Sequence, residues 1–321
     1  MIPSVNILIT GSKGQLGCEL RELLGSHNIT GQAEWQLFYT DIEELNIADP
    51  EAIDTFIRNN KIDIIINCAA YTAVDQAEED KEQAFLINGD APRYLAEALI
   101  KNRMNSCSDG NSDDGSATIR SHRNPFIIHI STDYVFDGMA SVPYNEESPT
   151  NPATIYGKSK LAGEIGIIDS GANYIIIRTS WLYSRYGKNF VKVISNSAAE
   201  KDEINVVADQ AGSPTNAADL AAVIIEIVSQ LTDNKPTPAY GVYHYSNEGV
   251  CTWYDFACEI VRLSGSKCRV NPITSDKFPT KAVRPAYSAL AKEKIKTVYG
   301  IDIPEWRDSL EKLSTPNQTD V

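Results

Sequence analysis

Short runs of β-branched and other apolar residues recur through the first two thirds of the chain and predict β-strands. The central runs are apolar at consecutive positions, as expected for strands that helices cover on both faces. The predicted strands are Val5–Thr10, Trp35–Asp41, Ile62–Asn67, Phe126–Ser131, Tyr174–Thr179 and Ile204–Ala208.

Amphipathic stretches with helical spacing lie between these runs. Asp49 is a typical N-cap residue, and Pro50 suits the first position of the helix that follows. The predicted helices are Leu16–Leu24, Pro50–Arg58, Lys81–Lys101 and Ala153–Asp169. Strands that alternate with helices are typical of β-α-β units. We therefore expect an α/β fold with a Rossmann-type, doubly wound parallel sheet.

The pattern changes near residue 180, where aromatic residues and prolines become frequent. Isolated helices are predicted beyond this point, at Ala217–Leu231, Tyr254–Ser264, Ser288–Tyr299 and Trp306–Leu313. We expect residues 1–180 to form the parallel-sheet domain, with a strand and a helix near 203–231 returning to it. Residues 181–313 should form mainly a smaller, partly interleaved α+β domain.

Two segments have few apolar residues that could anchor them. Residues 105–123 are rich in Ser, Asp, Asn and Gly and predict a surface insertion loop, with a functional lid as the alternative. Residues 314–321 predict a disordered tail.

The composition narrows the choice of partners and compartment. The 321 residues carry 43 acidic and 29 basic side chains, a net charge of −14, which argues against nucleic acid and anionic membrane surfaces as partners. No apolar run approaches the roughly 18 residues that span a bilayer. The six cysteines include no Cys-x-x-Cys pair, which favours the cytoplasm and argues against a zinc site or a disulfide framework.

A glycine motif, Gly11-x-x-Gly14-x-x-Gly17, joins the first predicted strand to the first predicted helix. This is the context of a dinucleotide fingerprint, in which the helix N-terminus faces a pyrophosphate. Close packing of strand and helix is the alternative explanation. Asp41, at the end of the second strand, suits the hydroxyls of an adenosine ribose, with a helix or turn cap as the alternative. An acid here disfavours a 2′-phosphate, so NADH should be accepted at least as well as NADPH.

Small residues end the third strand. Ala69 and Ala70 would let a cofactor lie against the backbone, although small residues also occur simply where a helix packs closely.

Tyr156 and Lys160 are four residues apart and share one helix face. A phenol has a pKa near 10, and a neighbouring lysine together with the positive ring of an oxidised nicotinamide would lower it toward the range of general acid–base catalysis. A solvated helix face is the common alternative for such a pair. Thr132 and Asp133 end the fourth strand, where they serve either a ligand or a turn, and Trp181 follows the fifth strand as a pocket wall or a core residue.

The four histidines lack metal-ligand spacing, so we predict no metal site. His129 lies within the fourth strand, and its simplest interpretation is a hydrogen-bonded core residue.

Longer stretches around these landmarks resemble the dTDP-4-dehydrorhamnose reductases, a branch of the extended short-chain dehydrogenase/reductases. The resemblance extends from residue 5 to about residue 312. The most particular matching stretches are Ser131-Thr-Asp-Tyr-Val-Phe-Asp-Gly138, Tyr156-Gly-Lys-Ser-Lys-Leu-Ala-Gly-Glu164, Arg178-Thr-Ser-Trp-Leu-Tyr183 and Asp209-Gln-Ala-Gly-Ser-Pro-Thr215.

The resemblance implies that NADPH or NADH reduces the 4-keto group of a nucleotide-linked sugar. The catalytic residues would be Tyr156, Lys160 and Thr132. The cofactor would be held by Gly11, Gly14, Gln15, Leu16, Gly17, Asp41, Asn46, Ile47, Ala69, Ala70, Tyr71, Tyr156 and Lys160. The sugar would meet Thr132, Asp133, Tyr156 and Trp181. Arg284 would contact the diphosphate, with a structural salt bridge as its alternative role.

Three questions stay open at this level. Asn46-Ile-Ala-Asp49 departs from the family pattern, which leaves the choice between NADPH and NADH open. Some family members dimerise through a metal ion; Glu19 matches one ligand but Ala218 stands at another, so that site is not predicted and a homodimer is left open. The alternative functions are a reductase or epimerase for another nucleotide sugar, and a non-catalytic subunit resembling the β subunit of methionine adenosyltransferase.

Overall fold

The computed structural model describes residues 4–26, 34–108, 124–232 and 239–314. Its centre is a six-stranded sheet in the order β10-β5-β4-β3-β1-β2, in which every neighbouring pair is parallel. The strands are β1 (Ser4–Thr10), β2 (Glu34–Tyr39), β3 (Ile64–Asn67), β4 (Phe126–Thr132), β5 (Asn173–Thr179) and β10 (Gly241–His244).

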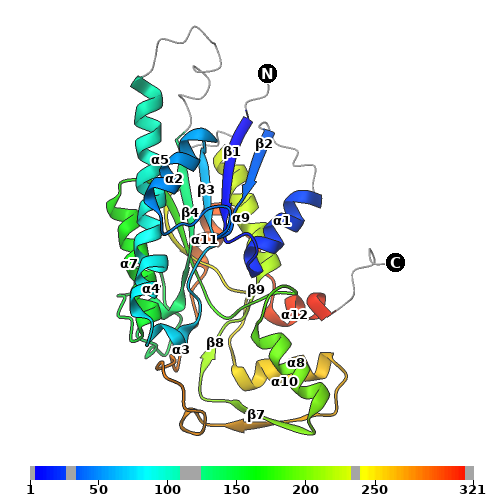
Figure 1. The fold of residues 1–321 in the computed structure, drawn as a ribbon. Helices are drawn as coiled ribbons and strands as arrows, with labels where there is room; N and C mark the ends of the chain where they lie inside the picture. The colour runs from blue at the N-terminus through cyan, green and yellow to red at the C-terminus, as the bar shows by residue number, and fades with distance from the viewer. Residues whose placement is uncertain (1–3, 27–33, 109–123, 233–238, 315–321) are drawn as a thin grey trace.

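Helices cover both faces of the sheet, as Figure 1 shows. One face packs against α1 (Gln15–Ser26), α9 (Ala217–Thr232) and α11 (Glu293–Tyr299). The other packs against α2 (Pro50–Asn59), α5 (Ala91–Ser108) and α7 (Ile155–Asp169). Residues of β1, β3, β4 and β5 contribute to both apolar clusters, because side chains alternate between the two faces of a strand. The predicted doubly wound, Rossmann-type α/β fold is therefore confirmed.

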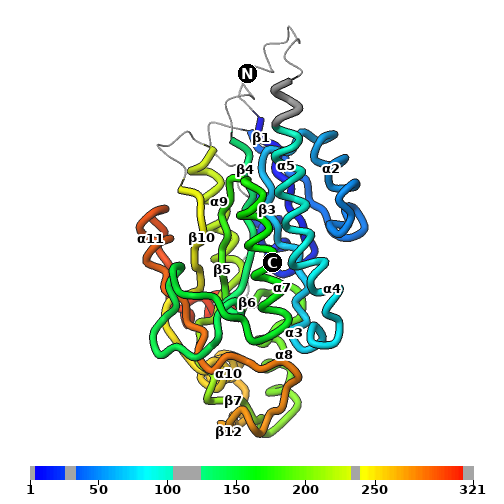
Figure 2. Tube along the Cα trace, turned by 90° about the vertical axis from the view of Figure 1, so that its left-hand side faces the viewer, coloured from blue at the N-terminus to red at the C-terminus, as the bar shows by residue number. Residues whose placement is uncertain are grey.

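A smaller unit follows β5 in the chain. Its core packs Phe256 and Trp306, both fully buried, among residues of three helices: α8 (Phe190–Glu200), α10 (Trp253–Leu263) and α12 (Trp306–Ser314). Its strands form two-stranded pairs: β7 (Glu203–Val207) with β12 (Arg269–Ile273), β6 (Leu182–Tyr183) with β9 (Thr215–Asn216), and β8 (Ala211–Gly212) with β11 (Cys251–Thr252). Figure 1 and Figure 2 both place α8, α10 and β7 at the end of the molecule opposite the N-terminus.

One predicted strand was assigned to the wrong sheet. The run Ile204–Ala208 was expected to return to the central sheet, but β7 pairs with β12 in the smaller unit. The sixth place in the central sheet belongs to β10, which pairs with β5. A β-branched run predicts a strand but not its partner, because strand pairing depends on the tertiary fold. The predicted helix Ala217–Leu231 does return, as α9.

Two predicted helices differ in their extent. The stretch Lys81–Lys101 is interrupted by a π-helical turn, η1 (Leu86–Asp90), between α4 (Lys81–Phe85) and α5. The helix expected from Ser288 begins only at Glu293, as α11. The remaining short helices are α3 (Val74–Ala77), η2 (Asp133–Val135) and η3 (Ser275–Lys277).

The predicted insertion loop and tail lie mostly outside the described residues. Residues 105–108 continue α5, so the insertion begins later than expected, and 109–123 are not described. Ser314 ends α12, and 315–321 are not described. No helix in the described part of the chain is long and apolar enough to cross a membrane.

Candidate active site

The predicted site residues converge because the six central strands are parallel and end at one edge of the sheet. The turns after β1, β2 and β3 carry the predicted cofactor contacts, and the segments after β4 and β5 carry Thr132, Asp133 and Trp181. Ligands of open α/β sheets bind at this carboxyl edge.

The glycine turn packs tightly against the end of β3. Gly11 has a φ of +63°, and a Cβ added there would lie 2.6 Å from the backbone nitrogen of Ala69. A Cβ on Gly17 would lie 2.3 Å from the Gly11 carbonyl oxygen. The backbone N–H of Gly14 donates to that same oxygen over 3.0 Å. Only glycine fits at positions 11 and 17, and the first-turn amides of α1 are left facing the turn.

Asp41 links the turn after β2 to the glycine turn. Its Oδ2 accepts a hydrogen bond from the backbone N–H of Lys13 over 3.0 Å. The Lys13 ammonium forms ion pairs with Glu43 at 2.7 Å and Glu44 at 3.2 Å, which raise the pKa of this lysine. Two carboxylates therefore pair with the Lys13 ammonium, and a third, that of Asp41, binds the backbone of the same residue at this end of the predicted dinucleotide site.

Two other predicted cofactor residues are held by asparagines. The side chain of Gln15 accepts a hydrogen bond over 3.0 Å from Asn189, which caps α8 of the smaller unit. The backbone N–H and C=O of Tyr71 are both bonded to the side chain of Asn88, at 2.8 and 3.0 Å. Asn88 lies in the π-helical turn, so this departure from regular helix positions the segment after β3.

The predicted cofactor residues differ in exposure. Leu16 and Ile47 are buried in the two sheet-face clusters, so any ligand contact they make is through backbone or the edge of the side chain. Asn46 is exposed, and its side chain accepts from the backbone N–H of Ala48. Ala70 is partly exposed at the carboxyl edge. Their cofactor contacts stay predictions.

Helix α7 starts beside the end of β4 and brings Tyr156 to the site. Its N-cap Thr154 accepts from the backbone N–H of Gly157 over 3.0 Å. A Cβ on Gly157 would lie 2.1 Å from the carbonyl oxygen of Tyr134, so the helix touches the η2 backbone. The Tyr156 ring meets the Tyr134 ring edge to face, with 5.4 Å between centroids.

Burial determines the protonation of Tyr156 in this structure. Burial raises the pKa of this phenol, and a hydrogen bond with Thr132 only partly opposes the rise. Tyr156 is therefore a protonated phenol at neutral pH. Lys160 Nζ donates to the Ile130 carbonyl oxygen at 2.5 Å and lies 3.4 Å from His129 Nε2. The expected lowering of the Tyr156 pKa by Lys160 together with an oxidised nicotinamide ring therefore stays a prediction.

Thr132 and Asp133 form a buried, hydrogen-bonded pair at the end of β4. The Thr132 hydroxyl donates to Asp133 Oδ1 over 2.9 Å and accepts from the backbone N–H of Tyr134 over 3.2 Å. Burial raises the pKa of the Asp133 carboxyl to about 6, while hydrogen bonds from Ser288 and Thr132 oppose the rise. This carboxyl can therefore change protonation near neutral pH.

Trp181 forms a flat wall beside these residues. It has a φ of +48°, which is unusual for a side chain of this size. Its indole stacks on Trp253, with 3.6 Å between ring centroids and 10° between planes. A Cβ on Gly212 would lie 2.8 Å from this indole and 2.7 Å from the Ser288 hydroxyl. The wall thus joins the segment after β5 to the smaller unit.

Arg284 lies beside η2 and already has partners in this structure. It forms an ion pair with Asp75 at 2.9 Å and donates to the Tyr134 hydroxyl at 3.4 Å. The alternative of a structural salt bridge is therefore present in this structure, and contact with a diphosphate stays a prediction. Sequence reasoning gave no role to Asp75, Asn88 or Ser288, because nothing local in the sequence marks their long-range partners.

A buried ion pair anchors α7 behind the site. Arg178 of β5 and Glu164 of α7 form an ion pair at 2.7 Å, with both side chains nearly inaccessible. Ser131 of β4 also donates to the Glu164 carboxylate. Leaving one of these charges unpaired in the interior would be strongly unfavourable, so the pair fixes the helix against both strands.

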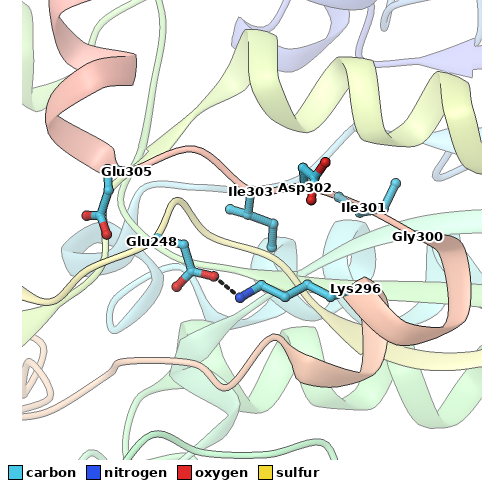
Figure 3. Close-up of a pocket in the computed structure, with 7 residues that line it drawn as sticks. All are labelled: Glu248, Lys296, Gly300, Ile301, Asp302, Ile303 and Glu305. Carbon is cyan, nitrogen blue, oxygen red and sulfur yellow. Dashed lines mark ion pairs between the residues drawn. The ribbon is translucent and has the colours of Figure 1, made fainter.

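A separate pocket of about 450 Å³ has no predicted site residue in its lining (Figure 3). Its walls come from Glu248, Lys296 and the segment 300–305. Glu248 is already paired with Lys296 and, at 3.1 Å, with Lys292. The carboxyl edge of the sheet therefore remains the candidate site.

A family described as "RmlD substrate binding domain" matches residues 5–104 and 115–318 of the chain. A dTDP-4-dehydrorhamnose reductase from Aggregatibacter actinomycetemcomitans is 37% identical over 313 residues, which cover 96% of this chain and 97% of that protein.

Solved structures extend the similarity to the fold. The crystal structure of a dTDP-4-dehydrorhamnose reductase from Clostridium acetobutylicum superposes with a TM-score of 0.83 at 38% identity, covering 96% of this chain and 98% of that one. The Bacillus anthracis dTDP-4-dehydrorhamnose reductase in complex with NADP gives a TM-score of 0.82 at 35% identity, covering 97% and 98%.

Proposed function

The chain belongs to the RmlD substrate-binding-domain family, and from this premise we propose that it reduces the 4-keto group of dTDP-4-dehydro-β-L-rhamnose to give dTDP-β-L-rhamnose. The observation that carries the proposal is the meeting of Tyr156, Thr132 and Asp133 at the sheet edge that also holds the glycine turn. Relatives named dTDP-4-dehydrorhamnose reductase match 96% of the chain.

The glycine turn fits a dinucleotide cofactor. Beyond residues 13–15, only the Gly11 carbonyl oxygen lies within 4 Å of a Cβ built on Gly14, so a ligand has access to the backbone there. The first-turn amides of α1, beginning at Gln15, would bind the pyrophosphate, and Asp41 would accept from ribose hydroxyls. NADPH or NADH bound in this way would supply the hydride.

Tyr156 donates the proton in this proposal. Its raised pKa keeps the phenol protonated, which is the form that reduction of a carbonyl requires. The proton moves from the Tyr156 hydroxyl to the sugar oxygen as that oxygen gains negative charge. Proton transfer of this kind contributes about 10²- to 10⁴-fold in rate.

Thr132 and Asp133 orient the keto sugar. In this structure the Thr132 hydroxyl donates a hydrogen bond to Asp133, so the hydroxyl must rotate before Thr132 can donate to a sugar oxygen. A protonated Asp133 would permit that turn by donating to Thr132 instead. Trp181 would exclude water from one side of the sugar, and Arg284 would bind the diphosphate.

The test compares turnover of Tyr156→Phe with that of the matched variant Tyr134→Phe. With dTDP-4-dehydro-L-rhamnose and reduced cofactor, Tyr156→Phe should lose about 10²- to 10⁴-fold in kcat, because only the donated proton is removed. Tyr134→Phe removes the hydroxyl of the adjacent ring and should stay within about tenfold of wild type.

Nicotinamide absorbance measures kcat, and fluorescence titration measures the cofactor Kd, which should be unchanged in both variants. Wild-type turnover by Tyr156→Phe would refute the assigned role. Failure of the wild-type protein to oxidise either cofactor with this sugar would refute the proposed reaction.

A further inference from the structure

A chain of four buried polar side chains crosses the sheet beneath the candidate site. The Thr10 hydroxyl lies 2.6 Å from Asn67 Oδ1, Asn67 Nδ2 lies 3.0 Å from His129 Nδ1, and His129 Nε2 lies 3.4 Å from Lys160 Nζ. All four residues are at most 2% exposed. The chain therefore runs from the glycine turn to the candidate catalytic lysine without reaching water.

Strand register builds this chain. Thr10 of β1 pairs with Asn67 of β3, and Asn67 pairs with His129 of β4, so successive members stand side by side on neighbouring strands. Lys160 enters from α7 and completes the row. Such a row needs a donor and an acceptor at every junction, because an unsatisfied buried polar group is unfavourable.

Among the described residues, no carboxylate pairs with Lys160 alone. The groups that face it are Glu164 on its own helix, Cys68 after β3, and His129 with the Ile130 carbonyl on β4. Arg178 and Ser131 already occupy the Glu164 carboxylate. A buried ammonium without its own counterion is poised to lose its proton.

The row can satisfy either form of the lysine. An ammonium donates to His129 Nε2, so the neutral imidazole carries its hydrogen on Nδ1 and donates to the Asn67 oxygen. A neutral amine instead accepts from Nε2–H, so Nδ1 accepts from the Asn67 amide nitrogen, and Thr10 donates to the Asn67 oxygen. Between the two states the Lys160–His129 pair loses one proton to solvent, and the Asn67 amide turns over.

We propose that His129 and Asn67 are positioning residues of the candidate active site, forming a hydrogen-bonded row whose direction reverses when Lys160 changes protonation. The row lets Lys160 keep one geometry as ammonium and as amine. The row itself does not depend on the proposed function. The proposed function adds only that the fixed Lys160 geometry serves cofactor binding.

Nitrogen NMR of the imidazole rings tests the row directly in ¹⁵N-labelled protein without substrate. The pKa of His129 lies well below its usual value because the ring is buried near Lys160, so the ring should stay neutral from about pH 6 to about pH 10. We expect the Nδ1–H tautomer at the acidic end and the Nε2–H tautomer at the basic end. The midpoint should fall near pH 8, since burial lowers the pKa of Lys160 to about 8.

His244 is the matched control within the same spectra. It is also fully buried, but its Nδ1 lies 3.1 Å from the Tyr144 carbonyl oxygen, which accepts only an Nδ1–H and so fixes that tautomer. Its resonances should not change form. The variant Lys160→Met should abolish the transition of His129, and His129→Gln assigns its resonances. A single His129 tautomer across the range, or an unchanged transition in Lys160→Met, would overturn the proposal.

A pH profile adds a readout that a purely structural role would not move. His129→Leu removes the acceptor, so Lys160 should lose its proton about tenfold more readily and the basic limb of kcat/KM should move down by about one pH unit. His129→Gln places an amide oxygen here that can accept from Lys160. It should restore the basic limb of the pH profile to its wild-type position. A basic limb of kcat/KM at the same pH in wild type and His129→Leu would contradict the proposed role of the row. The NMR transition needs no turnover, so it separates failure of this proposal from failure of the proposed reaction.

Discussion

At the scale of a single residue, Asp133 shows how burial sets the chemistry of a carboxyl group. The side chain is 3% exposed, and burial raises its pKa from 3.8 to about 6. The fold therefore favours its protonated form. The stabilisation is complete below the unfolded pKa near 3.9, and it is lost as the pH rises through about 6.

We predict that Asp133→Asn flattens part of the pH dependence of stability. A shift of about two pKa units corresponds to about 3 kcal/mol of unfolding free energy that wild type loses between about pH 4 and pH 7 and the variant does not. Urea denaturation of both proteins at the two pH values measures this difference. The prediction fails if the two proteins lose the same unfolding free energy over this range.

At the scale of an element, α7 is placed by two glycines with different surroundings. A Cβ on Gly157 meets the backbone of Tyr134 at 2.1 Å, whereas a Cβ on Gly166 meets only the side chain of Arg93, at 2.9 Å. Backbone cannot move aside easily, but a long side chain can. The first turn of α7, which carries Tyr156, is therefore the sensitive part of the helix.

We predict opposite effects for alanine at these two positions. Gly157→Ala should push the helix from η2 and reduce kcat at least tenfold, with a stability loss of about 1–3 kcal/mol from overpacking. Gly166→Ala should be neutral or stabilise by up to about 1 kcal/mol, because alanine favours helix. Thermal unfolding and turnover measure both variants, and equal behaviour would contradict this account of α7.

Elements with strong local sequence signals could be predicted, and elements without such signals could not. The strands of the α/β half and helices such as Pro50–Asn59 follow from local signals, here the cap Asp49 and the apolar positions Ile53 and Ile57. β10 was missed because it is a four-residue edge strand, Gly241–His244, with no alternating pattern. The partner of β7 depends on β12, far along the chain, and no local signal names it.

The site residues also divide into those that local sequence signals mark and those that depend on distant parts of the chain. Tyr156, Thr132 and Lys160 were predicted because motif spacing marks them. His129 was correctly predicted as a buried, hydrogen-bonded core residue, but its neighbours Asn67 and Lys160 come from other elements. Motif spacing did not reveal the burial that raises the pKa of the Tyr156 phenol.

At the scale of the whole molecule, the segment 278–288 connects the smaller unit to the sheet domain across the site. Arg284 bonds Asp75, Lys281 bonds Glu79, and the backbone N–H of Tyr287 donates to Gly138. At a second place, Ser184 donates to Glu19 of α1 over 2.6 Å. The two units are thus joined at more than one place.

We predict that Arg284→Ala raises the KM for the nucleotide sugar about 10- to 100-fold and changes the cofactor KM little, because a hydrogen bond to a charged group contributes about 1.5–3 kcal/mol. Asp75→Asn is the matched variant. It removes the partly exposed ion pair but keeps an acceptor for the backbone N–H of Ala282, so its effect should be small. Steady-state kinetics measures both. Equal rises in KM would assign the effect to the ion pair instead of to the substrate.

The stacked indoles of Trp181 and Trp253 also give the protein a built-in optical reporter. Two nearly parallel indoles with centroids 3.6 Å apart couple their electronic transitions, so they should produce a paired circular dichroism band that isolated tryptophans lack. Trp181 follows β5 and Trp253 begins α10, so the band belongs to the junction of the two units. Sugar binding against Trp181 would change its amplitude, and Trp253→Phe would remove it, which allows ligand arrival to be followed without a dye, a label or turnover.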